Sequence, residues 1–235
     1  MSLRIAFDLD GTVADMLTVL RQEAEQLFGE DTLSRQTYQV RDTPSAGPDE
    51  DPDNPAMAEL HLTPRQQMQL WDHVRQIDNF WLKLAETESG IIARIATVAY
   101  RRRWEVIFIT TRPASAGETV QLQSAQWLDA HGFALPSVFV VHGSRGKVAE
   151  ALGLDFVVDD RPDNCLDVAV DSKAKAILIW PDDPNKLPAG ARRLGIRPAA
   201  TIGEAVDLIE KYDDLRNEGG VVNSIKRFFG REQPS

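Results

Sequence analysis

Short apolar runs alternate with amphipathic segments along most of the chain. The runs are rich in β-branched residues, as is typical of strands, and the intervening segments repeat apolar residues every three or four positions, as is typical of helices. The predicted strands span residues 3–9, 105–110, 137–141, 156–159 and 174–180. Strands that alternate with helices predict an α/β fold with a parallel sheet covered on both faces.

Helices account for the rest of the pattern. Between the later strands they are predicted at 120–130, 147–152, 164–170 and 201–211, and between the first two strands at 13–40, 56–85 and 91–103. Thr63 and Pro64 are typical of an N-cap and a first helical position. Residues 41–55 are rich in Pro, Asp and Gly and predict a loop.

These elements predict a doubly wound, Rossmann-like sheet with a helical cap inserted after the first strand. We expect a core formed by residues 1–13 and 91–212, a helical cap formed by residues 14–90, and a flexible tail formed by residues 213–235. The cap is the longest segment that interrupts the strand–helix alternation.

Charge and cysteine content limit the classes of function. The chain has 26 Lys and Arg against 36 Asp and Glu, a net charge of −10, which argues against an extended nucleic-acid surface. A small phosphorylated substrate remains compatible, because local cations can override the overall field. The single cysteine, Cys165, cannot form an internal disulfide, and no apolar run is long enough for a membrane span, so we expect a cytoplasmic protein.

Polar residues follow the predicted strands at their carboxyl ends. Asp8 and Asp10 follow the first strand, and the later groups are Thr110-Thr111-Arg112, Lys147 and Asp159-Asp160. In an open α/β sheet these ends meet at one edge. One carboxylate there is usually a turn or helix cap, but two Asp pairs with a Thr and a Lys can hold a phosphate and a magnesium ion.

The stretch Asp8-Leu9-Asp10-Gly11-Thr12 resembles the first motif of the haloacid dehalogenase (HAD) superfamily, whose phosphatases carry D-x-D-G-T. The resemblance implies that Asp8 is the nucleophile and that Asp10 is the general acid and base. It implies that Thr110, or alternatively Thr111, binds the phosphoryl group and that Lys147 neutralises its charge. Asp8, Asp10 and Asp159 would hold Mg²⁺, with Asp160 a direct or indirect partner.

A narrower resemblance concerns the stretches FDLDGTVAD, ITTRP, QWLDAHGF and VVDDRPDN. They are similar to the 5′-nucleotidase, deoxy (pyrimidine), cytosolic type C family and its bacterial relatives. Residues 78–81 resemble the aromatic stretch that this family places near the base, which implies that Phe80 and Trp81 contact substrate. Thr111 and Arg112, which follow the predicted strand at 105–110, are further candidates for contact with the substrate phosphate. Packing in the hydrophobic core is the alternative for the two aromatic residues.

The resulting hypothesis is a Mg²⁺-dependent phosphomonoester hydrolase that acts through an aspartyl-phosphate, with a nucleoside monophosphate as the leading substrate. A phosphatase for a sugar phosphate or another small metabolite would carry the same strand-end residues. A HAD-fold binding protein without catalytic activity is the alternative from a different functional class.

Overall fold

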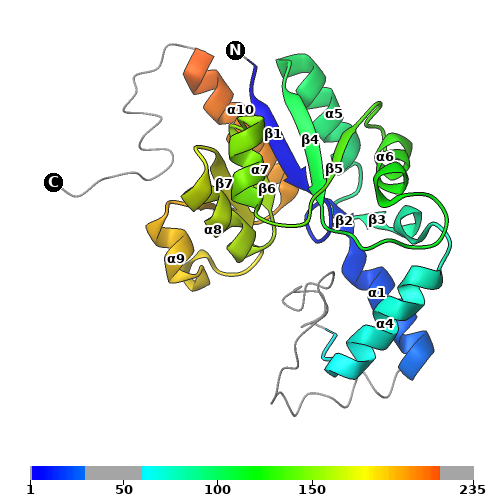
Figure 1. The fold of residues 1–235 in the computed structure, drawn as a ribbon. Coiled ribbons are helices and arrows are strands. Elements are labelled where there is room, and N and C mark those ends of the chain that lie inside the picture. Colours follow the sequence, from blue (N-terminus) through cyan, green and yellow to red (C-terminus); the bar gives the residue numbers. More distant parts are fainter. Residues whose placement is uncertain (1, 30–59, 218–235) are drawn as a thin grey trace.

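A parallel sheet of six strands runs through the molecule (Figure 1). The computed structural model describes residues 2–29 and 60–217. The strand order is β5-β4-β1-β6-β7-β8, so the first strand lies inside the sheet between β4 and β6. The strands are β1 (Arg4–Asp8), β4 (Glu105–Thr110), β5 (Ser137–Val140), β6 (Phe156–Asp159), β7 (Lys175–Ile179) and β8 (Arg197–Ala199).

Helices cover both faces of this sheet, as the alternation of side chains along β1 requires. Ile5 and Phe7 belong to a large apolar cluster with residues of α5, α6 and α10, whereas Ala6 belongs to a second cluster with residues of α7, α8 and α9. The helices are α5 (Ile91–Arg102), α6 (Val120–Ala130), α7 (Arg145–Leu152), α8 (Pro162–Asp171), α9 (Ala189–Arg193) and α10 (Ile202–Asn217), and a short 3-10 helix, η2, spans Pro184–Lys186. The predicted doubly wound α/β fold is confirmed.

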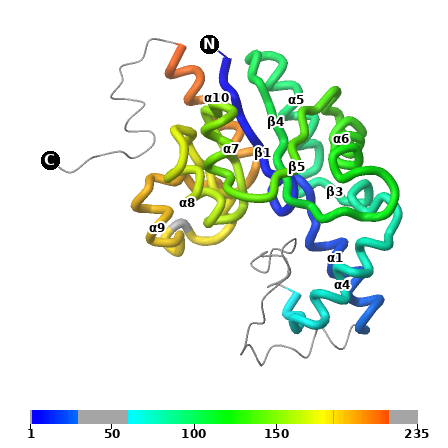
Figure 2. Tube along the Cα trace, viewed as in Figure 1, coloured from blue at the N-terminus to red at the C-terminus, as the bar shows by residue number. Residues whose placement is uncertain are grey.

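The segment between β1 and β4 carries its own helices. α1 (Met16–Phe28) and α4 (Pro64–Gln76) lie beyond the carboxyl ends of the strands (Figure 2), and a 3-10 helix, η1 (Phe80–Lys83), follows them. A two-stranded antiparallel sheet, β2 (Ala14–Asp15) with β3 (Ala85–Glu86), joins the two ends of this insertion. No helix among the described residues is long and apolar enough to cross a membrane.

Several predicted boundaries differ from the observed ones. α7 begins at Arg145, two residues before the predicted start, and α10 continues to Asn217, beyond the predicted start of the tail. Thr63 is the N-cap of α4 as predicted, and it forms a capping box with Gln66. The short elements β2, β3, β8 and α9 have too few residues to show a period and were not predicted.

Parts of the predicted insertion lie outside the described residues. Of the predicted helix at 13–40, the structure describes α1 and its end at Gly29. The predicted loop at 41–55 lies entirely outside the described residues, as does the tail after residue 217.

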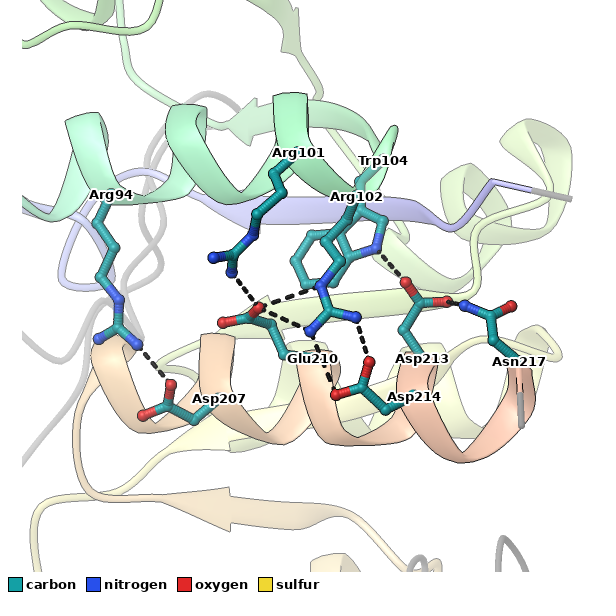
Figure 3. A network of polar contacts seen from close by, with 9 residues as sticks. All are labelled: Arg94, Arg101, Arg102, Trp104, Asp207, Glu210, Asp213, Asp214 and Asn217. Carbon is teal, nitrogen blue, oxygen red and sulfur yellow. Dashed lines mark hydrogen bonds and ion pairs between the residues drawn. The ribbon is translucent and has the colours of Figure 1, made fainter. Parts of the chain in front are cut away.

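Charged side chains join α5 to α10, two helices that pack on the same face of the sheet (Figure 3). Arg94 pairs with Asp207 at 2.5 Å, Arg101 pairs with Glu210 at 2.6 Å, and Arg102 contacts both Glu210 and Asp214. Near these pairs, which are exposed or partly buried, Trp104 Nε1 donates to Asp213 Oδ2 at 2.9 Å, and both of these residues are buried. The buried bond is therefore the contact whose loss should matter most for stability.

We expect Asp213→Ala to lower the free energy of unfolding by about 1–3 kcal/mol, because the Trp104 N–H would be left buried without an acceptor. Asp214→Ala is the matched control, since Asp214 is exposed and pairs with Arg102 in solvent. Urea denaturation of both variants checks this. A loss in Asp214→Ala as large as that in Asp213→Ala would show that the surface pairs, rather than the buried bond, hold α10.

Candidate functional site

The strand register brings the predicted polar residues to one edge of the sheet. Asp8 lies opposite Ile109 of β4, and Phe7 lies opposite Val158 of β6. The next residues along these two strands are Thr110 and Asp159. Both therefore lie beside the turn that contains Asp10, at the carboxyl edge where sites form in open α/β sheets.

The turn after β1 depends on a glycine. Gly11 has φ = +82°, and a Cβ at this position would lie 2.3 Å from Asp160 Oδ2. Any side chain there would be strained and would collide with the carboxylate. The next residue, Thr12, donates from Oγ1 to Asp160 Oδ1 at 3.0 Å, and its carbonyl accepts from Thr87 Oγ1 at 2.7 Å. Through Thr12, the turn thus contacts both Asp160 and Thr87, which follows β3 at the end of the insertion.

Arg145, which the sequence analysis did not include among the candidate site residues, contacts Asp8 directly. Arg145 Nη2 donates to Asp8 Oδ1 at 2.8 Å, and the arginine is buried. Lys147 is exposed, and its backbone N–H donates to Ser144 Oγ at the start of α7. Arg145 is therefore the basic residue that contacts the predicted nucleophile, and the role of Lys147 in neutralising the phosphoryl charge stays a prediction.

Helix phase explains why Arg145, rather than Lys147, lies beside Asp8. Ser144 is the N-cap of α7, which makes Arg145 its first residue and Lys147 its third. Arg145 and Ala149 are four positions apart and are both buried, whereas Lys147 and Glu150 are exposed. The sequence contained this signal, because Arg145 is in phase with the apolar face of the helix and Lys147 is not.

Arg112 pairs with Asp10 from the end of β4. Its Nε lies 2.9 Å from both Asp10 carboxylate oxygens, and Nη2 lies 2.7 Å from Oδ1. Thr110 Oγ1 donates to Asp10 Oδ2 at 3.0 Å, and it accepts from the Arg112 backbone N–H at 3.2 Å. Thr110 is buried and Thr111 is exposed, so Thr110 is the threonine that reaches the aspartates.

Asp159 is fully buried and held by groups of its own segment. Its Oδ1 accepts from the Arg161 backbone N–H at 2.8 Å, and both oxygens accept from Asn164 Nδ2, at 3.1 and 3.0 Å. Arg145 Nε lies 3.9 Å from Oδ2. The sequence analysis did not include Asn164, because a polar residue in a first helical turn is ordinarily explained by capping.

Crowding of buried carboxylates raises their pKa values. Burial, followed by the charge of Asp160, raises the pKa of Asp159 to about 7. Burial, followed by the charge of Asp8, raises the pKa of Asp160 to about 7. The pKa of Asp8 is also raised well above its usual range, first by burial and then by Asp159, although Arg145 opposes both effects. The site therefore favours an additional positive charge.

The donor set fits a magnesium ion that retains water and substrate oxygens. Among residues 2–29 and 60–217, no group of three or more His, Cys, Asp or Glu side chains is arranged to hold a metal by itself. Mg²⁺ is usually bound through one or two carboxylates together with waters and phosphate oxygens, so it does not need such a group. Asp8 and Asp160 are hard oxygen donors, and each raises the pKa of a neighbouring carboxyl group.

Phe80 and Trp81 do not line this site. Both side chains are 0% exposed and belong to the large apolar cluster, where their rings meet edge-on with centroids 4.9 Å apart. Neither ring has a face open to a ligand, which contradicts the prediction that they contact substrate. Core packing, the alternative considered from the sequence, describes them correctly.

Comparisons with known proteins find similarity to solved structures but no match in sequence. Neither models of protein families nor curated protein sequences match the chain. A hydrolase from Pseudomonas syringae shares 12% identity at a TM-score of 0.49, over 89% of this chain and 99% of that one. A HAD-superfamily hydrolase of subfamily IA from Geobacter sulfurreducens shares 16% identity at a TM-score of 0.49, over 88% and 100%.

CbbY from Rhodobacter sphaeroides, solved in complex with phosphate, shares 14% identity at a TM-score of 0.42, over 87% of this chain and 96% of that one. Because all three TM-scores are below 0.5, the chemistry of this chain has to be inferred from its own residues.

Without metal, the raised pKa of Asp160 makes stability depend on pH. The pKa of Asp160 is about 7 in the folded chain against an ordinary value of 3.8. The protonated carboxyl group therefore contributes fully to the free energy of unfolding below about pH 4, and this contribution is lost as pH rises to about 7. Asp160→Asn does not titrate and keeps an acceptor for Thr12 Oγ1. In EDTA, we expect the melting temperature of Asp160→Asn to rise relative to the native chain over this pH window. A difference that is constant with pH would contradict the assignment.

Proposed function

We propose that the chain is a HAD-superfamily phosphatase, which hydrolyses phosphomonoesters through an aspartyl-phosphate on Asp8. The observation that supports this most strongly is Arg145 Nη1, a buried N–H donor beside Asp8 with no acceptor among the described residues. A buried donor without a partner costs about 1–3 kcal/mol. A phosphate oxygen bound beside Asp8 supplies the missing acceptor, and a guanidinium group binds oxyanions of this kind well.

In the proposed reaction, Asp8 is the nucleophile and Asp10 is the general acid and base. An Asp8 oxygen forms a bond to phosphorus while the ester bond breaks, and Asp10 gives a proton to the leaving oxygen. Asp10 then accepts a proton from the water that attacks phosphorus, which breaks the Asp8–phosphorus bond and restores both residues. Arg145 favours the ionised form of Asp8 that the first step needs, and it stabilises negative charge on the phosphoryl group.

Asp8 and Asp160, with the backbone carbonyl of Asp10, are the groups that would hold Mg²⁺. When bound, the ion supplies positive charge that offsets the crowded carboxylates and the phosphoryl oxygens. The contacts support Asp160 rather than Asp159 as the second carboxylate ligand. Both oxygens of Asp159 already accept hydrogen bonds, and it lies near Arg145, whereas Asp160 lies against the turn that contains Asp10.

The proposed substrate is a small phosphomonoester. A nucleoside monophosphate remains the leading candidate because of the four stretches that resemble 5′-nucleotidases. The burial of Phe80 and Trp81 removes the stacking platform that was the main support for a base in the cap. A panel of nucleotides, sugar phosphates and aryl phosphates should therefore decide the substrate.

We expect Asp8→Asn to abolish phosphatase activity without loss of fold, because an amide of the same shape is not a nucleophile. The assay is phosphate release from that panel, with and without Mg²⁺, together with a circular dichroism melt. Asp207→Asn is the matched control, since Asp207 lies exposed on α10 and pairs with Arg94.

Activity in Asp8→Asn above a few per cent of that in the control would remove Asp8 from the nucleophilic role. A native chain that is inactive on the whole panel with Mg²⁺ would leave the catalytically idle binding protein as the better description.

We expect Asp160→Asn to raise the Mg²⁺ concentration needed for half-maximal activity about ten-fold, the equivalent of roughly 1.4 kcal/mol of ligand interaction. Asp159→Asn should leave this concentration nearly unchanged and should instead lower kcat, because Arg145 loses a neighbouring charge. Titration of activity with Mg²⁺ after removal of metal with EDTA measures both variants. The opposite ranking of the two Mg²⁺ requirements would make Asp159 the ligand.

A further inference from the structure

Arg112 is almost completely enclosed by protein. Its side chain is 0% exposed, although arginine is rarely buried unless it is paired. Besides its contacts with Asp10, Nη1 donates to Ser124 Oγ at 2.9 Å in α6. The guanidinium group is thus held from two directions, by Asp10 and by Ser124, although Nη2 lies 2.7 Å from Asp10 Oδ1 without a hydrogen-bond partner among the described residues.

Trp81 covers the guanidinium group of Arg112. The Arg112 Cζ atom lies 4.8 Å from the centroid of the Trp81 ring, a cation–π arrangement. Trp81 Nε1 donates to the Pro113 carbonyl at 3.0 Å, and its backbone N–H donates to Gln123 Oε1 at 3.1 Å. The ring is therefore bound to the loop after β4 through Pro113, and the Trp81 backbone is bound to α6 through Gln123.

The same loop is tied to the insertion a second time, through Asn79. The Asn79 backbone N–H donates to the Ala116 carbonyl at 2.8 Å, and Asn79 Oδ1 accepts from the Glu118 backbone N–H at 2.9 Å. Asn79 has φ = +48°, in the left-handed region. A Cβ on Gly117 would lie 2.5 Å from Asn79 Oδ1, so the two segments are in close contact. Residues 78–81 and the loop after β4 thus form one packed unit.

We propose that Trp81 and Arg112 are positioning residues for Asp10, and that the inserted segment controls the acid–base step through them. This inference rests on the proposed phosphatase function. A carboxylate that must give and then take a proton needs a fixed direction, and a planar guanidinium group can fix it with several donors, which a lysine cannot do. Trp81 keeps that plane in place. The aromatic residue of the cap thus acts on the leaving group through two side chains, without touching substrate.

Proton donation matters most when the leaving group is a strong base. Phenyl phosphate releases a more basic oxygen than p-nitrophenyl phosphate, while the two esters differ little in size. A displaced Asp10 should therefore lower kcat/KM much more for phenyl phosphate, since general acid catalysis typically contributes about 10²–10⁴-fold. The ratio of the two kcat/KM values in one preparation does not depend on the fraction of folded protein.

The experiment measures this ratio in the full chain with Mg²⁺ for Arg112→Gln, Trp81→Leu and Trp81→Phe. We expect the ratio to shift against phenyl phosphate roughly ten-fold or more in the first two variants. Trp81→Phe keeps an aromatic face over Arg112 and should restore most of the native ratio. Trp127→Leu is the matched control, because Trp127 is an equally buried indole whose Nε1 donates to the Leu84 carbonyl.

An equal loss on both esters in Arg112→Gln and Trp81→Leu would overturn the positioning role while leaving the phosphatase function intact. The same shift in Trp127→Leu would also overturn it, because the effect would then be a general result of core damage. A native chain that hydrolyses neither ester nor any other phosphomonoester would overturn the proposed function, and this inference with it.

Discussion

Buried negative charge at the carboxyl edge of the sheet is the constraint on which the rest of the site depends. Four aspartates come together there from two neighbouring strands, and burial with mutual repulsion raises the pKa of three of them. Each aspartate has its own means of support. Arg145 contacts Asp8, Arg112 contacts Asp10, Asn164 holds Asp159, and Thr12 holds Asp160. These contacts leave the pKa values of the carboxyl groups raised and leave Arg145 Nη1 without an acceptor among the described residues. The site therefore favours a cation beside the carboxylates and an oxyanion beside Arg145.

The fold supplies these partners from different layers. Arg145 comes from the first residue of α7 on one face of the sheet, whereas the groups around Arg112 come from α6 and η1 on the other. The two basic residues therefore approach the aspartates from opposite sides. In the proposed reaction, the α7 side serves the phosphoryl group and the insertion side serves proton transfer.

The sequence predicted the sheet, the position of the aspartates and the use of a basic residue, because these follow from apolar periodicity and from the ends of strands. It failed where tertiary packing decides between neighbouring residues. Arg145 is not among the predicted site residues, although its phase on α7 brings it to Asp8. For the aromatic pair at residues 80–81 the sequence leaves substrate contact and core packing both open, and in the structure both side chains are enclosed in the core. Asn164 is not among the predicted site residues, since no local pattern distinguishes a helix-capping residue from a partner of Asp159.

Trapping the covalent intermediate tests the central claim most directly. The native chain would be mixed with a saturating phosphomonoester and Mg²⁺, quenched in acid within one turnover, digested and analysed by mass spectrometry. The account predicts that the peptide containing Asp8 gains one phosphoryl group, that hydroxylamine removes it, and that Asp8→Asn shows none. Substrate turnover with no phosphorylated Asp8, or with the phosphoryl group on another residue, would contradict the account.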